Sequence, residues 1–151
     1  MKILMVCLGN ICRSPLAEGI LQAKATEKNL AWEVDSAGMG NWHAGEQPDI
    51  RSIRVAEQYG IDLRTQRARQ FEYADFKRFD HNYDMDDHNY AAILQKAKNN
   101  RDREKVAMIL EERWPGENRS VPDPYYGHAA DFERVFQLLD EACAVIVEKY
   151  H

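Results

Sequence analysis

The order of apolar segments along the chain predicts an α/β fold, with a parallel sheet that has helices on both of its faces. Short apolar runs typical of buried strands alternate with longer segments whose apolar residues recur at helical spacing. A helix between two strands can return the chain across the sheet, so that the next strand runs parallel to the last. Such sheets bind ligands beyond the carboxyl ends of their strands, which directs attention to the loops there.

The first strand and the first helix are the clearest elements. Residues 2–7 form a short apolar run that ends at Gly9 and Asn10, which predicts a buried strand followed by a turn. Ser14 and Pro15 are typical of an N-cap and a first helical turn, and apolar residues at helical spacing follow them. The motif VCLGNICRSP therefore connects a strand to a helix.

Strands and helices continue to alternate over the rest of the chain. Residues 32–37 predict a second strand, and Pro48 and Gly60 bound a second helix. Three further segments predict a helix at 88–98, a strand at 106–110 and a long amphipathic helix at 131–150. A third strand is expected at 83–86. The surrounding segment 78–90 is unusually polar and acidic, and residues 81–84 are more polar than a buried strand should be, so a solvated loop or a helix start remains an alternative for this segment.

Length and composition predict one domain over residues 1–151, of which 44% are hydrophobic. The apolar runs are far shorter than the roughly 20 residues that cross a bilayer, and we find no secretory leader, so we expect a cytoplasmic protein without a membrane partner. Three cysteines, an odd number, also suit a reducing compartment. The net charge of −5 and the scattered basic residues argue against nucleic acid as a partner.

The motif has the composition of an anion-binding loop. Cys7 and Arg13 bracket five residues, which are Leu8, Gly9, Asn10, Ile11 and Cys12. The backbone N–H groups of such a loop can point inward and, with the positive end of the following helix, bind a tetrahedral oxyanion. The Arg13 guanidinium adds a permanently charged fork that can hold two oxygens at once.

The same surroundings favour the thiolate form of Cys7, which is the nucleophilic form of a cysteine. A thiolate beneath a bound phosphate monoester is placed to attack phosphorus and form a cysteinyl phosphate. We expect the acid for the leaving oxygen at Asp123, which lies between Pro122 and Pro124 in a segment that cannot be helical. Taken by itself, this segment is also compatible with a turn aspartate beside core tyrosines.

The motif VCLGNICRSP together with DPYYG resembles the low-molecular-weight protein tyrosine phosphatases. Further blocks resemble the family's landmarks in the same order along essentially the full chain, namely DSAG, WHAGEQPDIRS, RARQ and MDDHN. The resemblance implies a flavodoxin-like three-layer sandwich, with a four-stranded parallel sheet in the order 2-1-3-4 and a phosphate-binding loop after strand 1. It also implies an enzyme that hydrolyses phosphotyrosine in proteins without cofactor or metal, has a cognate tyrosine kinase as a partner and is inhibited by phosphate-like oxyanions.

The resemblance also implies roles for individual residues. Cys7 would be the nucleophile, Arg13 would bind the phosphoryl group, and Asp123 would act as general acid and then general base. Supporting roles around the loop are implied for Asn10, Ser14, Ser36 and Asp86. One departure concerns this support, because Gln66 stands where family members commonly carry a histidine that joins the network through Asn10. Glutamine can still donate and accept hydrogen bonds, so we expect activity to survive.

Two further roles compete with plainer interpretations. Cys12 matches a family cysteine that forms a reversible disulfide with Cys7, although a small apolar filler would also suit the position. Trp42, Tyr125 and Tyr126 match rim positions that hold an aryl phosphate. Trp42 is also compatible with a half-buried surface aromatic.

Four other functions remain alternatives. An arsenate reductase would need further cysteines, but none lies between Cys12 and Cys143, and Cys143 is expected in the core. Relatives that act on phosphoarginine carry threonine at the position of Ile11, whose apolar side chain favours an aryl ester. A phosphocysteine phosphocarrier would need neither Arg13 nor Asp123, and a binding module without turnover would lack one catalytic group.

Overall fold

Four parallel strands form the centre of the molecule and confirm the predicted sheet. The computed structural model describes residues 1–151. The strand order is β2-β1-β3-β4, as the family resemblance implied, and every neighbouring pair is parallel. The strands are β1 Lys2–Cys7, β2 Glu33–Gly38, β3 His81–Asp84 and β4 Val106–Met108.

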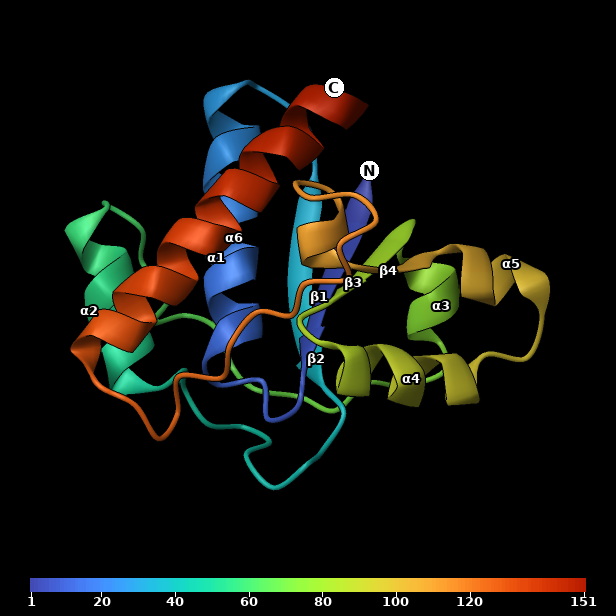
Figure 1. Ribbon diagram of the computed structural model, residues 1–151, viewed down its shortest axis with the longest axis horizontal. Coiled ribbons are helices and arrows are strands. Elements are labelled where there is room, and N and C mark those ends of the chain that lie inside the picture. Colours follow the sequence, from blue (N-terminus) through green and yellow to red (C-terminus); the bar gives the residue numbers. More distant parts are fainter.

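Helices cover both faces of the sheet and complete three layers (Figure 1). Helices α1, α2 and α6 lie on one face, and α3, α4 and α5 lie on the other (Figure 1). Their bounds are α1 Arg13–Glu27, α2 Ile50–Gln58, α3 Asp75–Arg78, α4 Asp87–Lys96, α5 Asn100–Glu104 and α6 Ala129–Tyr150, with a 3₁₀ turn at Ile109–Glu111. None of the helices combines the length and the apolar character that a membrane crossing requires.

The central strand β1 contributes to a separate core on each face of the sheet. Ile3 and Met5 pack in the larger core beneath α1 and α6, whereas Leu4 and Val6 pack in the smaller core beneath α3 and α4. A strand that is buried on both faces needs apolar side chains at successive positions rather than alternate ones. This requirement explains the uninterrupted apolar run that made β1 visible in the sequence.

The start of α1 differs from the prediction. The helix begins at Arg13 with Cys12 at its N-cap, so Ser14 is not the cap. The Ser14 hydroxyl is instead hydrogen-bonded within the loop after β1, to Cys7 and Asn10. The first turn of α1 therefore has no side-chain cap, and the Ser14 hydroxyl binds within the loop instead.

The bounds of α2 and β4 also differ from the prediction. Helix α2 begins at Ile50 rather than at Pro48, because the Asp49 carboxylate accepts a hydrogen bond from the N–H of Arg51 and caps the helix. The last strand is shorter than the predicted segment 106–110, since its final apolar residues form the 3₁₀ turn.

Strand β3 is buried between β1 and β4, so the alternative of a solvated loop at 81–84 is wrong. Asn82 and Asp84 pair in register with Leu4 and Val6 and face the same side of the sheet. Both polar side chains are fully buried. Neither the amide group of Asn82 nor the carboxyl group of Asp84 has a hydrogen-bond partner.

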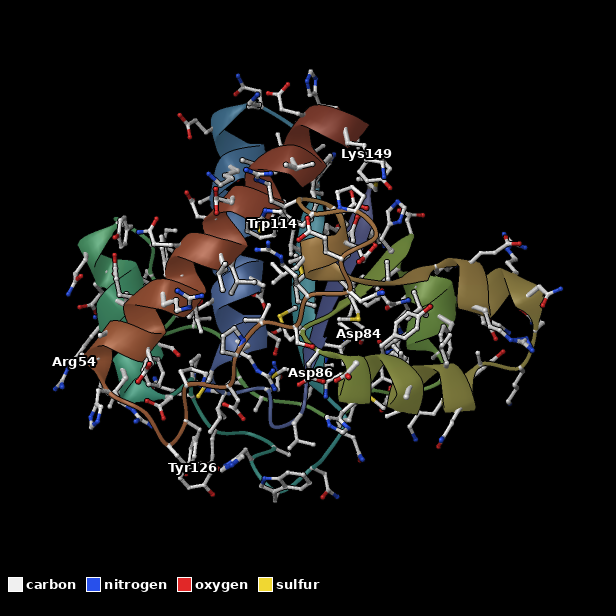
Figure 2. All side chains as sticks on the ribbon, in the orientation of Figure 1. Arg54, Asp84, Asp86, Trp114, Tyr126 and Lys149 are labelled. Atoms are coloured by element: carbon white, nitrogen blue, oxygen red, sulfur yellow. The ribbon has the colours of Figure 1, made fainter.

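Replacing Asp84 by valine is expected to stabilise the protein by about 1–3 kcal/mol at pH 7. Burial raises the pKa of Asp84 well above its usual range, and the charge of Asp86, which follows on the same segment beside α4, raises it further (Figure 2). The folded state then keeps a proton that the unfolded chain releases above about pH 4. Stability therefore falls as the pH rises from the unfolded to the folded pKa, and valine removes this cost.

Urea unfolding of wild type and Asp84→Val at pH 5 and pH 7 measures this effect. The stability gained should be larger at pH 7 than at pH 5. Asp84→Asn is the matched control, because it removes the ionisable group but keeps a buried polar one, and should stabilise less than valine does. A valine variant that is less stable than wild type at pH 7 would show that the carboxyl group has a favourable partner.

Three loops meet at the carboxyl end of the sheet (Figure 1). The loop after β1 is formed by residues 8–12, and the loop after β2 begins at Met39, whose N–H donates to the Cys7 carbonyl at 3.0 Å. The third loop, residues 120–128, precedes α6. Its Val121 N–H donates to the backbone just after β3 at 2.7 Å. Segments far apart in the sequence are thereby joined where a parallel sheet binds its ligands.

Candidate active site

The Cys7 thiol lies at the base of the loop formed by residues 8–12. The N–H of Asn10 donates to its Sγ at 3.2 Å, and the Ser14 hydroxyl lies 3.0 Å from the same atom. Asn10 has a φ of 58°, in the left-handed region that asparagine tolerates better than most residues. The sulfur therefore faces a backbone N–H group, a hydroxyl group and the N-terminus of α1.

The Asn10 side chain connects this loop to its surroundings. Its Nδ2 donates to Ser14 Oγ at 2.8 Å and to Ser36 Oγ at 3.0 Å, and its Oδ1 accepts from the N–H of Arg69 at 3.0 Å. Gly38, at the end of β2, allows the loop to pack closely against β2, because a Cβ at this position would lie only 2.9 Å from a carbonyl oxygen of the loop. Three polar contacts thus hold Asn10 in its left-handed conformation.

The Arg13 guanidinium is buried and held from two sides. Its Nη1 donates to Asp86 Oδ2 at 2.7 Å and to the Val121 carbonyl at 2.9 Å. Asp86 is itself fixed, because its Oδ1 accepts from the N–H of Asn89 and caps α4. These contacts use both protons of Nη1, and the remaining N–H groups of the fork are free to bind an anion.

Asp123 reaches the same place from the other end of the chain. Its Oδ2 lies 3.9 Å from Nη2 of Arg13, and its Oδ1 accepts from the N–H of Tyr125 at 3.1 Å. The side chain is half exposed, unlike that of Arg13. A carboxyl group in this position can exchange protons with solvent while it faces a ligand of Arg13.

One cavity of about 420 Å³ brings the predicted catalytic and rim residues together. Its lining consists of Cys7, Leu8, Gly9, Ile11, Cys12, Arg13, Trp42, His43, Asp123, Tyr125 and Tyr126. The supporting residues Asn10, Ser14 and Asp86 lie behind this lining in contact with its members, and Ser36 contacts Asn10.

The outer wall of the cavity is aromatic and exposed. The rings of Tyr125 and Tyr126 meet edge to face with centroids 4.9 Å apart, and the Tyr126 side chain projects into solvent (Figure 2). Trp42 lines the same cavity and is 60% exposed. With Ile11, these rings form apolar walls around a polar base, an arrangement that suits a flat ring ending in an anionic group.

Cys12 differs from Cys7 in its electrostatic surroundings. Burial raises the pKa of the Cys12 thiol to about 12, and the negative charges of Asp49 and Asp123 add to the effect. Cys12 is therefore a neutral thiol at physiological pH. Cys143 is buried in the core, as expected, and all three cysteines are free.

Some residues of the site were not found from the sequence. His43 lines the cavity, and its Nδ1 lies 2.9 Å from Glu46 Oε2. The sequence signal that could have placed His43 at the site is its position directly after Trp42, a predicted rim residue. Gln66 does not replace the expected histidine as a support of Asn10, because its Nε2 donates to the Pro15 carbonyl at 3.1 Å.

Together these groups can hold a tetrahedral anion between the loop N–H groups and Arg13, with a thiolate beneath it and a carboxyl group above it.

The family model described as "Low molecular weight phosphotyrosine protein phosphatase" matches residues 2–150. A Synechocystis sp. relative described as a "Putative low molecular weight protein-tyrosine-phosphatase" is 43% identical over 145 residues, which cover 95% of this chain and 92% of that protein. The Homo sapiens low molecular weight phosphotyrosine protein phosphatase is 35% identical and covers 99% of this chain, with 96% of its own length matched.

Solved structures show the same likeness in three dimensions. A protein tyrosine phosphatase from Entamoeba histolytica, crystallised with Hepes in its active site, superposes with a TM-score of 0.92 at 35% identity, over 99% of this chain and 96% of its own. The Drosophila arginine phosphatase superposes with a TM-score of 0.92 at 30% identity, over 99% and 98%.

Proposed function

The chain belongs to the low molecular weight phosphotyrosine protein phosphatases, and on that premise we propose that it hydrolyses phosphotyrosine in proteins through a phosphoryl group carried by Cys7. The observation that best supports this mechanism is the cavity in which Cys7, Arg13 and Asp123 meet. Cys7 supplies the nucleophile, Arg13 supplies a cation for the phosphoryl oxygens, and Asp123 supplies an acid for the leaving oxygen.

In the first step the Cys7 thiolate attacks phosphorus opposite the aryl oxygen. The S–P bond forms as the P–O bond to the tyrosine ring breaks, and Asp123 gives its proton to the departing phenolic oxygen. Charge on the phosphoryl oxygens is balanced by the loop N–H groups and by Arg13. Asp86 and the Val121 carbonyl keep the guanidinium in place during the transfer.

In the second step water attacks the phosphorus of the cysteinyl phosphate. Asp123, now a carboxylate, accepts a proton from that water as the new P–O bond forms. The S–P bond breaks, and the thiolate is regenerated together with inorganic phosphate. The Ser14 hydroxyl, 3.0 Å from Sγ, donates a hydrogen bond to the thiolate as it leaves.

Substrate choice follows from the walls of the cavity. The exposed rings of Trp42 and Tyr126 can pack on both faces of a phosphotyrosine ring while its phosphate reaches the loop. A phosphoserine side chain is too short to use these rings. Ile11 offers no charge or hydrogen bond to the guanidinium group of a phosphoarginine, so we propose an aryl ester as the preferred substrate.

A panel of three peptides that differ only in the phosphorylated residue tests the proposal. The peptide with phosphotyrosine should be hydrolysed with a kcat/KM roughly 100-fold or more above those with phosphoserine and phosphoarginine. Activity should persist in a chelator of divalent cations and fall when inorganic phosphate is added. Preference for the phosphoarginine peptide would replace this function with arginine phosphatase activity, and dependence on added metal would contradict the cysteinyl-phosphate mechanism.

The proposal extends to the cell. We place the enzyme in a reducing cytoplasm, where a tyrosine kinase generates its substrates. When peroxide oxidises the Cys7 thiolate to a sulfenic acid, the Cys12 thiol can attack that sulfur, form a disulfide and release water. The disulfide would protect Cys7 from further oxidation until a reductant restores both thiols.

A further inference from the structure

A carboxylate outside the cavity is linked to Cys7 by hydrogen bonds. Glu18 lies on α1, four positions after Ser14, and its Oε1 accepts a hydrogen bond from the Ser36 hydroxyl at 2.7 Å. It does not line the cavity and so cannot touch the substrate. Ser36 is the residue that accepts from Asn10, so Glu18 stands at the far end of the network that supports the loop.

The hydrogen bonds of the network run outward from Asn10 Nδ2, in one branch through Ser36 to Glu18 and in the other through Ser14 to the sulfur. Because the Ser36 hydroxyl gives its proton to Glu18, its oxygen accepts from Asn10 Nδ2. The other proton of Nδ2 goes to Ser14 Oγ. Since the oxygen of the Ser14 hydroxyl accepts from Asn10, its proton can be donated to Cys7 Sγ, which lies 3.0 Å away.

Hydroxyl groups can reverse this direction, because each is both donor and acceptor. Two groups prevent the reversal. The backbone N–H of Arg69 holds the oxygen of the Asn10 amide, and an ionised Glu18, which can only accept, holds the Ser36 hydroxyl. A charged acceptor also strengthens the hydrogen bonds of its own branch, from Ser36 to Glu18 and from Asn10 to Ser36.

We propose that Glu18 is a positioning residue for the nucleophile, whose ionised carboxylate fixes the direction of the Ser36–Asn10–Ser14 hydrogen bonds and so supports the Cys7 thiolate. It acts only through these three residues. Since Cys7 is the nucleophile in the proposed function, the effect of Glu18 on turnover rests on that function, but its effect on the reactivity of the thiol does not.

The surroundings of Glu18 make this support sensitive to pH. Burial raises the pKa of Glu18 to about 7; the hydrogen bond from Ser36 opposes this shift. Two charged groups face it, Asp35 from β2, which raises the pKa, and Arg69 from the segment before α3, which lowers it. The Arg69 guanidinium is shared with Asp35 and Asp75, and it therefore compensates Glu18 incompletely.

The sign of the pH effect follows from the change in hydrogen bonding. Below about pH 7 Glu18 becomes a neutral carboxylic acid, which can donate its own proton to Ser36. The Ser36 hydroxyl is then no longer required to point at Glu18, and the fixed direction of the network is lost. Support for the thiolate should thus be present above pH 7 and decline as the pH falls through 7.

Alkylation of Cys7 by iodoacetamide, followed by mass spectrometry between pH 5 and 8.5, measures this support without any phosphatase turnover. Wild type should show an inflection near pH 7. In Glu18→Gln the inflection should be absent, and the rate at pH 8 should be roughly 3- to 10-fold lower, because the neutral amide can donate to Ser36 as well as accept from it and no longer fixes the direction of the hydrogen bonds. The kcat of phosphotyrosine hydrolysis should fall by a similar factor with little change in KM.

Two controls separate positioning from general stability. Glu27→Gln removes an exposed carboxylate from the same helix and should leave the alkylation profile unchanged. Ser36→Ala interrupts the network, so adding Glu18→Gln to it should cause little further loss. A Glu18→Gln variant that keeps the inflection, or that adds its full effect to Ser36→Ala, would overturn the proposal. Altered alkylation with unchanged turnover would instead count against Cys7 as the catalytic nucleophile.

Discussion

Replacing Cys7 by serine is expected to lower phosphate release by roughly 1000-fold or more, because it removes the only nucleophile beneath the anion. A hydroxyl group ionises far less readily than a thiol, and the hydrogen bonds from Asn10 and Ser14 do not close that gap. The loop itself should remain intact, since oxygen can accept the same hydrogen bonds. The variant should therefore still bind inorganic phosphate while it fails to turn over.

Stopped-flow measurement with p-nitrophenyl phosphate separates the two steps of the reaction. Wild type should release p-nitrophenol in a burst that matches the enzyme concentration if breakdown of the cysteinyl phosphate is slow. The Cys7→Ser variant should show neither burst nor steady release. Cys143→Ala is the matched control, because Cys143 is buried in the core away from the cavity. Its folded fraction should retain wild-type turnover, and substantial turnover by Cys7→Ser would exclude the covalent mechanism.

The sequence revealed the parts of the fold whose local pattern agrees with their final surroundings. Strand β1 is buried on both faces and is apolar at each position after Lys2, and α6 has a continuous apolar face. Strand β3 was ambiguous because Asn82 and Asp84 place unpaired polar groups in the core, against the usual rule. Helices α3 and α5 are too short to show a helical period.

Strand order was not available from local pattern at all. Parallel pairing joins segments that are far apart in the chain, and periodicity does not say which strands become neighbours. The order 2-1-3-4 came from the family resemblance, and the observed sheet agrees with it.

The residues of the candidate site likewise divide into those that local sequence predicts and those that depend on contacts between distant segments. The spacing of Cys7 and Arg13 predicts the anion loop because both residues belong to one turn between a strand and a helix. Ser14 was misassigned as an N-cap, since sequence cannot show that its hydroxyl is occupied by Cys7 and Asn10. Glu18 was missed because it lies on α1 whereas its partner Ser36 lies on β2, a contact that local pattern does not show.

Replacing Asp123 by alanine is expected to slow hydrolysis of phosphotyrosine by roughly 100- to 10,000-fold, the usual contribution of a general acid or base. The phenolic oxygen of tyrosine leaves poorly without a proton, and no other carboxyl group lines the cavity. The loss should depend on the leaving group. The p-nitrophenolate ion is stable without a proton, so formation of the cysteinyl phosphate from p-nitrophenyl phosphate should be slowed much less.

This dependence provides an internal control within one variant. With phenyl phosphate, Asp123→Ala should be slow in the first step. With p-nitrophenyl phosphate it should show a clear burst followed by slow release, because the same residue also activates the water that cleaves the S–P bond. A variant that is slowed equally with both leaving groups would contradict the acid role. Because Asp123 lies 3.9 Å from Arg13, such a uniform loss would mean that the carboxylate chiefly orients the guanidinium, and the proton would have to reach the leaving oxygen from solvent.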